Sequence, residues 1–290
     1  MFRRQTSGSV VCASCGYLVG VNDDKCYHCG RRNPSLFGFA PALRSLGHDM
    51  GFVPFVTGFC ILMFGLELLV GGISTQPSLF GFLSPARPSP FLFGASGGVP
   101  IFSGRWWTVL SASWLHGGLL HILFNLMWIR QLAPAVGEFY GPGRMVIIYV
   151  LGGAAGFLAT GLMYYAYAAG WLPRILAGSA LSVGASASLF ALMGALVYYG
   201  NRTGSQFIRS QVMSWAIFAF VIGFVMSGVD NYAHAGGFGG GYLLGRLLDP
   251  LRSEQVNHIL FAVVLLVLSV LSIVASVIHG LPIMRAMGYM

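Results

Sequence analysis

Four polar residues in otherwise apolar stretches carry side chains that can catalyse hydrolysis. Ser186 opens "SASLFALMGA", His234 lies in "DNYAHAGGFGGGYLLGR", and His121 and Asn125 share "WLHGGLLHILFNLMW". An imidazole within hydrogen-bonding reach of a serine hydroxyl can act as its general base. A histidine and an asparagine four residues apart lie on one helical face, where both can donate hydrogen bonds to a developing oxyanion. The set predicts nucleophilic attack by Ser186 with His234 as the base.

Four of the five cysteines have the spacing of a metal site. They form two Cys-x-x-Cys knuckles, Cys12 with Cys15 and Cys26 with Cys29. Four thiolates can surround a zinc ion tetrahedrally and leave no open position for chemistry, so the spacing predicts a structural zinc ribbon. Two disulfides are the alternative, but thiols stay reduced in the cytoplasm, where we expect this head. His28, between two of the cysteines, is expected to be a solvated neighbour.

The composition is that of a membrane protein. Hydrophobic residues make up 56% of the 290 residues and charged residues only 8%, against roughly 25% charged residues in soluble domains. After a polar head, seven apolar segments are long enough to cross a bilayer: residues 51–72, 109–131, 143–168, 183–200, 209–228, 231–248 and 257–279. The expected fold is therefore all-α and polytopic, and the last segment, apolar nearly all round, predicts an anchor beside the core.

The basic residues predict the orientation. If the head is cytoplasmic, that side collects twelve of the 16 basic residues: Arg3, Arg4, Lys25, Arg31, Arg32, Arg44, Arg130, Arg144, Arg202, Arg209, Arg246 and Arg252. The other side keeps Arg87, Arg105, Arg174 and Arg285. Cytoplasmic loops carry the positive excess, so we expect a multi-pass protein of a bacterial cytoplasmic membrane with its N-terminus inside and its C-terminus outside. The net charge of +8 then reflects topology, and no nucleic-acid partner is expected.

This topology brings the polar residues to one depth. The second, fourth and sixth segments all run from outside to inside, so the segment starts that carry His121, Ser186 and His234 share the outer leaflet. A second Gly-Ala-Ser triplet, in "FGASGG" at 93–98, falls in the long outer loop and predicts a plain glycine-rich loop around Ser96. Ser186 is therefore the candidate nucleophile.

Glycines at 237, 241 and 245 recur every fourth residue and predict close approach of the sixth and fourth segments, where Gly184, Ser188 and Ala191 are also small. Such packing would bring the Ser186 hydroxyl to His234. A lone serine in a membrane helix is more often a packing residue, and a lone histidine a satisfied core residue. The coincidence of the pair with His121 and Asn125 at one depth favours the catalytic interpretation.

Residues 50–250 closely resemble the rhomboid family of intramembrane serine proteases. The matching stretches are "GRWWTVLSASWLHGGLLHILFNL" at 104–126, "VGASASLFALMGA" at 183–195 and "NYAHAGGFGGGYLLG" at 231–245. They are similar to the family's tryptophan-arginine loop with its His-x-x-x-Asn helix, its Gly-x-Ser-Gly helix and its Ala-His helix. The head and the seventh segment lie outside the resemblance.

The resemblance implies a catalytic dyad of Ser186 and His234 that needs no cofactor. It also implies oxyanion donors at His121, Asn125 and the backbone N–H of Ser186, and an aromatic ring at Phe190 that packs on the imidazole. Ala187 departs from the family pattern, since the family has glycine after the nucleophile. The methyl group there could narrow the approach of a substrate or displace the helix.

The predicted organisation is a zinc-ribbon-like cytoplasmic domain at 1–35, a linker at 36–50, a rhomboid-like six-helix core at 51–250, and a seventh transmembrane helix with a tail at 251–290. The predicted function is an intramembrane serine endopeptidase that cleaves transmembrane helices of protein substrates in the lipid bilayer near its outer face. A rhomboid-like pseudoprotease that binds such clients without cleavage is the alternative, and a transporter or channel is a second one. The head is expected to dock a cytoplasmic partner or to steady the first span.

Overall fold

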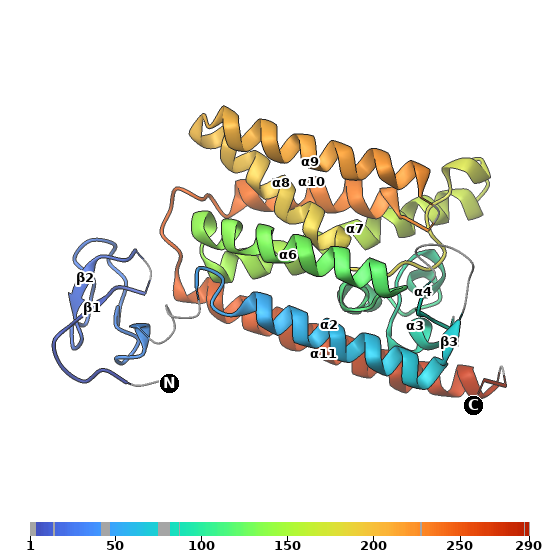
Figure 1. Cartoon of the computed structure of the whole chain (residues 1–290), viewed down its shortest axis with the longest axis horizontal. Coiled ribbons are helices and arrows are strands. Elements are labelled where there is room, and N and C mark those ends of the chain that lie inside the picture. Colours follow the sequence, from blue (N-terminus) through green and yellow to red (C-terminus); the bar gives the residue numbers. More distant parts are fainter. Residues whose placement is uncertain are drawn as a thin grey trace.

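The computed structural model describes residues 4–13, 15–41, 47–74, 82–86, 88–226, 228–286 and 288–289. Three of the arginines counted for orientation, Arg3, Arg44 and Arg87, lie outside the described residues. A small head with two strands stands beside a bundle of helices, and the two termini lie at opposite ends of the molecule (Figure 1). The head strands β1 (Ser9–Val11) and β2 (Leu18–Gly20) pair antiparallel, with Val10 opposite Val19.

The described part of the bundle contains seven long helices: α2 (Phe52–Gly71), α6 (Leu119–Tyr140), α7 (Pro142–Ala168), α8 (Ser186–Thr203), α9 (Gln206–Val225), α10 (Asn231–Leu247) and α11 (Val256–Ala286). Between α2 and α6 lie five short elements, β3 (Ile73–Ser74), β4 (Ser84–Pro85), α3 (Pro88–Phe93), α4 (Gly98–Phe102) and α5 (Thr108–Ser111), followed by the 3-10 turn η2 (Ala112–Trp114). Another 3-10 turn, η3 (Arg174–Leu176), precedes α8.

Helices α2, α6, α7, α9 and α11 are long and apolar enough to cross a membrane. Helix α10, with 17 residues, spans only about 25 Å. Helix α8 has twelve of its 18 residues buried by its neighbours. Because it is surrounded by protein, it does not need the high hydropathy of a helix that faces lipid. The fold is thus a helical membrane protein with a six-helix core, one additional C-terminal helix and a small ribbon.

The second predicted span was wrong at its start by ten residues. The chain is helical from Thr108 to Trp114, but it then extends at Leu115 and Gly118, and α6 begins at Leu119. Hydropathy alone could not locate this break, because the residues on both sides of it are equally apolar. His116 therefore precedes the helix that carries His121, although the two rings still lie 5.3 Å apart.

Helices α7, α8 and α10 form the most closely packed part of the core. A Cβ added at Gly237 or Gly241 would overlap the backbone of Ala187 or Ala191 on α8, and one at Gly245 would lie 3.1 Å from the Cα of Ala195. The predicted close approach of the fourth and sixth segments is therefore correct, and Ala191 faces α10 as predicted, together with Ala187 and Ala195 in place of Gly184 and Ser188.

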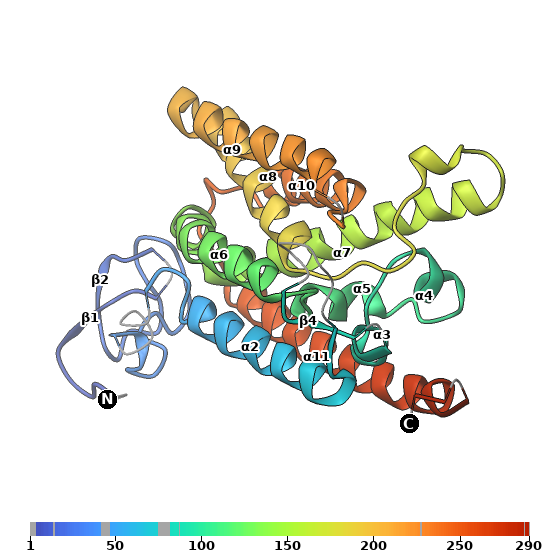
Figure 2. The same ribbon diagram turned by 45° about the vertical axis from the view of Figure 1, so that its right-hand side comes forward.

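Helix α11 is more than a peripheral anchor. It packs against α7, α3 and α5, and Figure 2 shows it running along the bundle below these elements. Its buried face is rich in serine, with Ser269, Ser272 and Ser276 at 4% exposure or less. The seventh segment was predicted to be apolar nearly all round, and this buried stripe of serines is the exception.

Candidate active site

The candidate nucleophile and base meet where two helices begin. Ser186 is the first residue of α8, and His234 lies in the first turn of α10. The Ser186 Oγ and His234 Nε2 atoms lie 2.9 Å apart, although the residues are 48 positions apart in sequence. This distance allows the hydroxyl to donate a hydrogen bond to the imidazole, the arrangement needed for proton transfer from serine to histidine.

The His234 ring is oriented by packing. It is 6% exposed, and the Phe190 ring stacks on it with centroids 4.3 Å apart and an angle of 11° between the planes. His234 Nδ1 has no hydrogen-bond partner among the described residues. Asp230 caps α10 through the Ala233 N–H, 3.0 Å from its Oδ1, and it lies one helical turn before His234.

Two hydrogen-bond donors face the same site from α6. The Gly117 N–H donates to His121 Nδ1 at 3.3 Å, so the proton of the neutral ring is on Nε2, which is then a donor. Asn125 is 5% exposed, and its Nδ2 has no partner in the described part of the chain. A Cβ added at Gly184, two residues before Ser186, would lie 2.6 Å from His121 Nε2 and 3.7 Å from Asn125 Nδ2.

The start of α8 supplies a third donor. The backbone N–H groups in the first turn of a helix have no partner within the helix, and the helix dipole makes this end partly positive. Ser186 is the first helical residue, and Gly184 before it has φ +127, which an L side chain rarely adopts. Glycine at 184 therefore lets the chain turn into α8 with the side chains of α6 close by.

The methyl group of Ala187 is accommodated. Ala187 is 1% exposed and packs in a small cluster with Ala112, Phe157 and Ala233. A Cβ at Gly156 on α7 would lie 2.9 Å from the Ala187 methyl, so the missing side chain at 156 makes the room for it. The methyl therefore packs in this buried cluster without displacing α8 from α7 and α10.

Ser96 lies in the short glycine-rich loop between α3 and α4, as predicted, and it is a structural residue there. Ser96 is fully buried. Its backbone pairs with Ser182 through two hydrogen bonds of 3.0 and 2.7 Å, and its hydroxyl accepts one from Thr108 Oγ1 at 3.3 Å. The second Gly-Ala-Ser triplet thus joins the segment between α2 and α6 to the extended segment that leads into α8.

Sequence analysis missed a buried polar pair behind the site. Glu67 on α2 is fully buried, and its Oε2 accepts a hydrogen bond from the backbone N–H of His116 at 3.3 Å. The His116 ring is also fully buried and contacts His121. The sequence signal for this pair was the carboxyl group inside the apolar segment "LMFGLELLVG", since ionisable residues at membrane depth usually have a functional role or a polar partner.

The four head cysteines form a candidate metal centre. Their Sγ atoms all lie within 4.8 Å of one another, with 3.7 Å between Cys12 and Cys29 and 3.6 Å between Cys15 and Cys26. Ligands at the usual Zn–S length of about 2.3 Å in a tetrahedron lie about 3.8 Å apart, so the residues fit a zinc ion. His28 stacks on Tyr17 with centroids 3.6 Å apart and stands outside the cluster.

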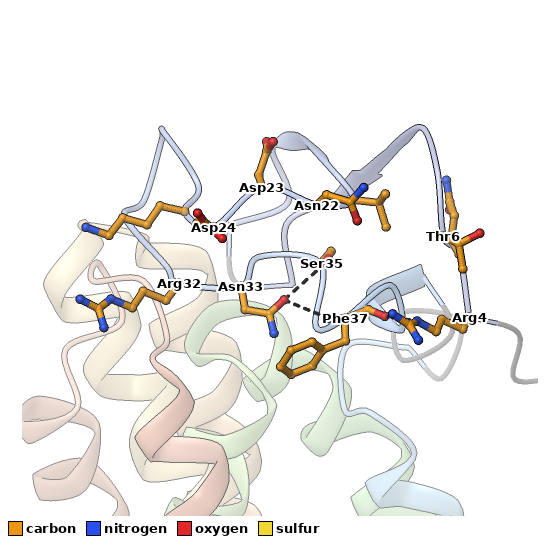
Figure 3. A pocket seen from close by; sticks show the side chains of 12 residues that line it. Arg4, Thr6, Asn22, Asp23, Asp24, Arg32, Asn33, Ser35 and Phe37 are labelled. Carbon is orange, nitrogen blue, oxygen red and sulfur yellow. Dashed lines mark hydrogen bonds between the residues drawn. The ribbon is translucent and has the colours of Figure 1, made fainter.

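A separate cavity of about 620 Å³ lies in the head, between the hairpin and the chain after the knuckles. Figure 3 shows side chains of both charges around it, among them Arg4, Asp23, Asp24 and Arg32. The Asn33 side chain, which also lines the cavity, accepts a hydrogen bond from the Phe37 N–H at 3.0 Å. None of the four cysteines lines this cavity, so it is distinct from the metal centre.

Comparison with known proteins places this geometry in a family. The profile of the rhomboid domain matches residues 103–251. The chain is 30% identical over 214 residues to the Rhomboid protease GluP of Bacillus subtilis, a match that covers 72% of this chain and 37% of that protein. It is 30% identical over 150 residues to the putative rhomboid protease YdcA of the same organism, covering 51% of this chain and 69% of YdcA.

A third relative is RHOMBOID-like protein 4 of Arabidopsis thaliana, 32% identical over 146 residues that cover 49% of this chain and 34% of that protein. The matches therefore span little more than a third of the length of GluP and of the Arabidopsis protein. Since the domain match covers half of the chain and includes α6, α8 and α10, which carry the candidate residues, the chain belongs to the rhomboid family.

Proposed function

We propose that this chain is an intramembrane serine endopeptidase with Ser186 as nucleophile and His234 as general base. The observation that carries the proposal is the 2.9 Å contact between Ser186 Oγ and His234 Nε2, beside the His121 ring and the Asn125 amide, whose Nδ2 has no hydrogen-bond partner among the described residues. The relatives named as rhomboid proteases support a protease of this class.

The mechanism follows from these atoms. The Ser186 Oγ attacks the carbonyl carbon of a peptide bond while His234 Nε2 takes the hydroxyl proton. The negative oxygen that forms receives hydrogen bonds from His121 Nε2, Asn125 Nδ2 and the Ser186 N–H. The imidazolium then gives its proton to the leaving amine, and a water molecule hydrolyses the acyl-enzyme by the reverse sequence.

The substrates in this proposal are transmembrane helices of other proteins, cut near the outer face of the membrane. His121, Ser186 and His234 lie in the first turns of α6, α8 and α10, with Asn125 one turn further along α6, at the end of the bundle away from the head (Figure 1). The excess of basic residues at the head end supports a cytoplasmic head and a site near the outer face. Ser186 is half-buried, so a substrate must be unwound to reach it.

The deciding experiment compares the wild type with Ser186→Ala in detergent. We expect the wild type to cleave a single-pass substrate with small residues near its outer end and to react with a fluorophosphonate, and the variant to do neither. A wild type that binds the substrate but is neither acylated nor active would favour the pseudoprotease. Equal cleavage by both proteins would mean that Ser186 is not the nucleophile.

For the head, we propose that the four cysteines hold a structural zinc ion. Four protein thiolates would complete its coordination, so the ion would stabilise the head and take no part in catalysis. The mixed charges around the head cavity support a role in docking a polar segment of a cytoplasmic partner. Metal analysis of the purified chain tests the first point: about one zinc ion per chain is expected, and much less after Cys12→Ser.

A further inference from the structure

The outer loop between α2 and α6 is bonded to the C-terminal helix. The Trp107 Nε1–H donates to Ser276 Oγ at 3.1 Å, and the Ser272 hydroxyl donates to the Trp107 carbonyl at 2.7 Å. The His279 ring lies 4.9 Å from the Trp107 ring. One tryptophan of the loop is thus held by three residues of α11 along two helical turns.

Arg105 adds a second attachment. The Arg105 side chain is 4% exposed, and its Nη2 donates to the carbonyls of Ser276 at 3.0 Å and Phe91 at 3.1 Å. Its guanidinium also lies 4.2 Å above the Phe91 ring. A buried cation that lost these carbonyls would be costly, so the contacts specify one position of the loop on α11.

The same loop is bonded to the start of α8. Ala112 accepts a hydrogen bond from the Gly184 N–H at 2.9 Å, and the Ser113 and Ser188 hydroxyls lie 3.0 Å apart. Trp107, Ala112 and Ser113 are joined by one short helical segment, α5 followed by η2, which spans only Thr108–Trp114. A shift of the loop on α11 would therefore reach Gly184, two residues before Ser186.

We propose that α11 is a positioning element of the active site, with Ser272 and Ser276 as positioning residues that act through Trp107 and the α5–η2 turns on the start of α8. This inference rests on the proposed function for its catalytic consequence, but its structural part stands independently. Helix α11 lies outside the matched rhomboid domain. In this inference it nevertheless contributes to catalysis by positioning the start of α8.

The serines of α11 offer a matched control. The Ser269 hydroxyl donates only to the Leu265 carbonyl of its own helix, at 3.0 Å, and Ser269 is 1% exposed. Ser269→Ala therefore removes the same atom from the same helix at similar burial without touching the loop. One neutral hydrogen bond changes an equilibrium by about fivefold. The Ser272→Ala/Ser276→Ala double variant removes two such bonds, so we expect the equilibrium between the attached and the displaced loop to change by about tenfold or more.

The test uses the full chain in detergent and two readouts. Deuterium uptake by peptides covering 104–116 and 179–186 reports the loop and the start of α8, and steady-state cleavage separates kcat from KM. In the double variant we expect faster uptake in both peptides and a kcat about tenfold lower, with KM unchanged. Ser269→Ala is expected to match the wild type. Trp107→Phe combined with Ser276→Ala should be no worse than the more damaging of the two single changes, because both remove the same hydrogen bond.

The outcomes separate this inference from the proposed function. A wild type without cleavage would reject the function, while the uptake experiment would still decide whether α11 holds the loop. Uptake in the double variant equal to that in Ser269→Ala would overturn the inference even in an active enzyme. Additive effects of Trp107→Phe and Ser276→Ala would also overturn it, since the two residues would then act separately.

Discussion

The Gly184→Ala substitution adds one methyl group beside His121 and so tests the geometry of the candidate active site. The Gly184 φ of +127 is strained for any L side chain, and a Cβ there would lie 2.6 Å from both Cε1 and Nε2 of His121. Ordinary contact begins at 3.4 Å, so the ring must move by about 0.8 Å or α8 must start elsewhere. Misplacement of a catalytic group by about 1 Å can cost about 100-fold in rate.

For Gly184→Ala we therefore expect kcat to fall by about 100-fold, the size of the loss when one oxyanion donor is removed. The matched control is Gly204→Ala at the other end of α8, where φ is +75 but nothing lies within 4 Å of the added Cβ. It carries the backbone strain of about 1–2 kcal/mol without the collision. Its thermal midpoint should fall, and its kcat should stay near the wild-type value.

The assay is acylation of Ser186 by a fluorophosphonate together with cleavage of a transmembrane substrate, both in detergent. Thermal unfolding of each variant shows whether the fold has survived. If folded Gly184→Ala were acylated and turned over at the wild-type rate, His121 would not stand where the mechanism needs it. The oxyanion assignment would then be wrong.

Three further changes test other parts of the structure. Gly241→Ala places a methyl against the Ala191 backbone and should lower the unfolding free energy by about 1–3 kcal/mol, whereas Gly239→Ala, with nothing within 4 Å, should have little effect in the same thermal scan. Asp230→Asn keeps the cap of α10 but removes the charge near His234, so we expect an unchanged midpoint and a kcat about fivefold lower, or about 1 kcal/mol; an unchanged kcat would exclude an electrostatic role. Removal of metal by a chelator should expose the head to protease while α2 to α11 keep their thermal midpoint; a head that stays resistant would show that its fold does not depend on metal.

The membrane-spanning architecture and the contact between Ser186 and His234 could be predicted from the amino-acid sequence. Apolar length and the direction of successive spans are local properties, and they place both residues at one depth. The four-residue glycine repeat on α10 likewise predicts close packing, because helix periodicity converts spacing into a face. The same holds for the clustering of the four head cysteines, whose thiols come from two short turns.

The tautomer of His121, the space for the Ala187 methyl and the partners of the α11 serines could be seen only in the folded structure. The proton on His121 Nε2 depends on the Gly117 N–H, and that contact arises from a break before α6 which no hydropathy pattern marks. The room for the Ala187 methyl comes from Gly156 on another helix. The serines of α11 gain their partners from Trp107, which is 165 residues or more away in the chain. Contacts of this kind depend on how separate helices pack together. The residue pattern of one segment does not predict which residues of another helix it contacts.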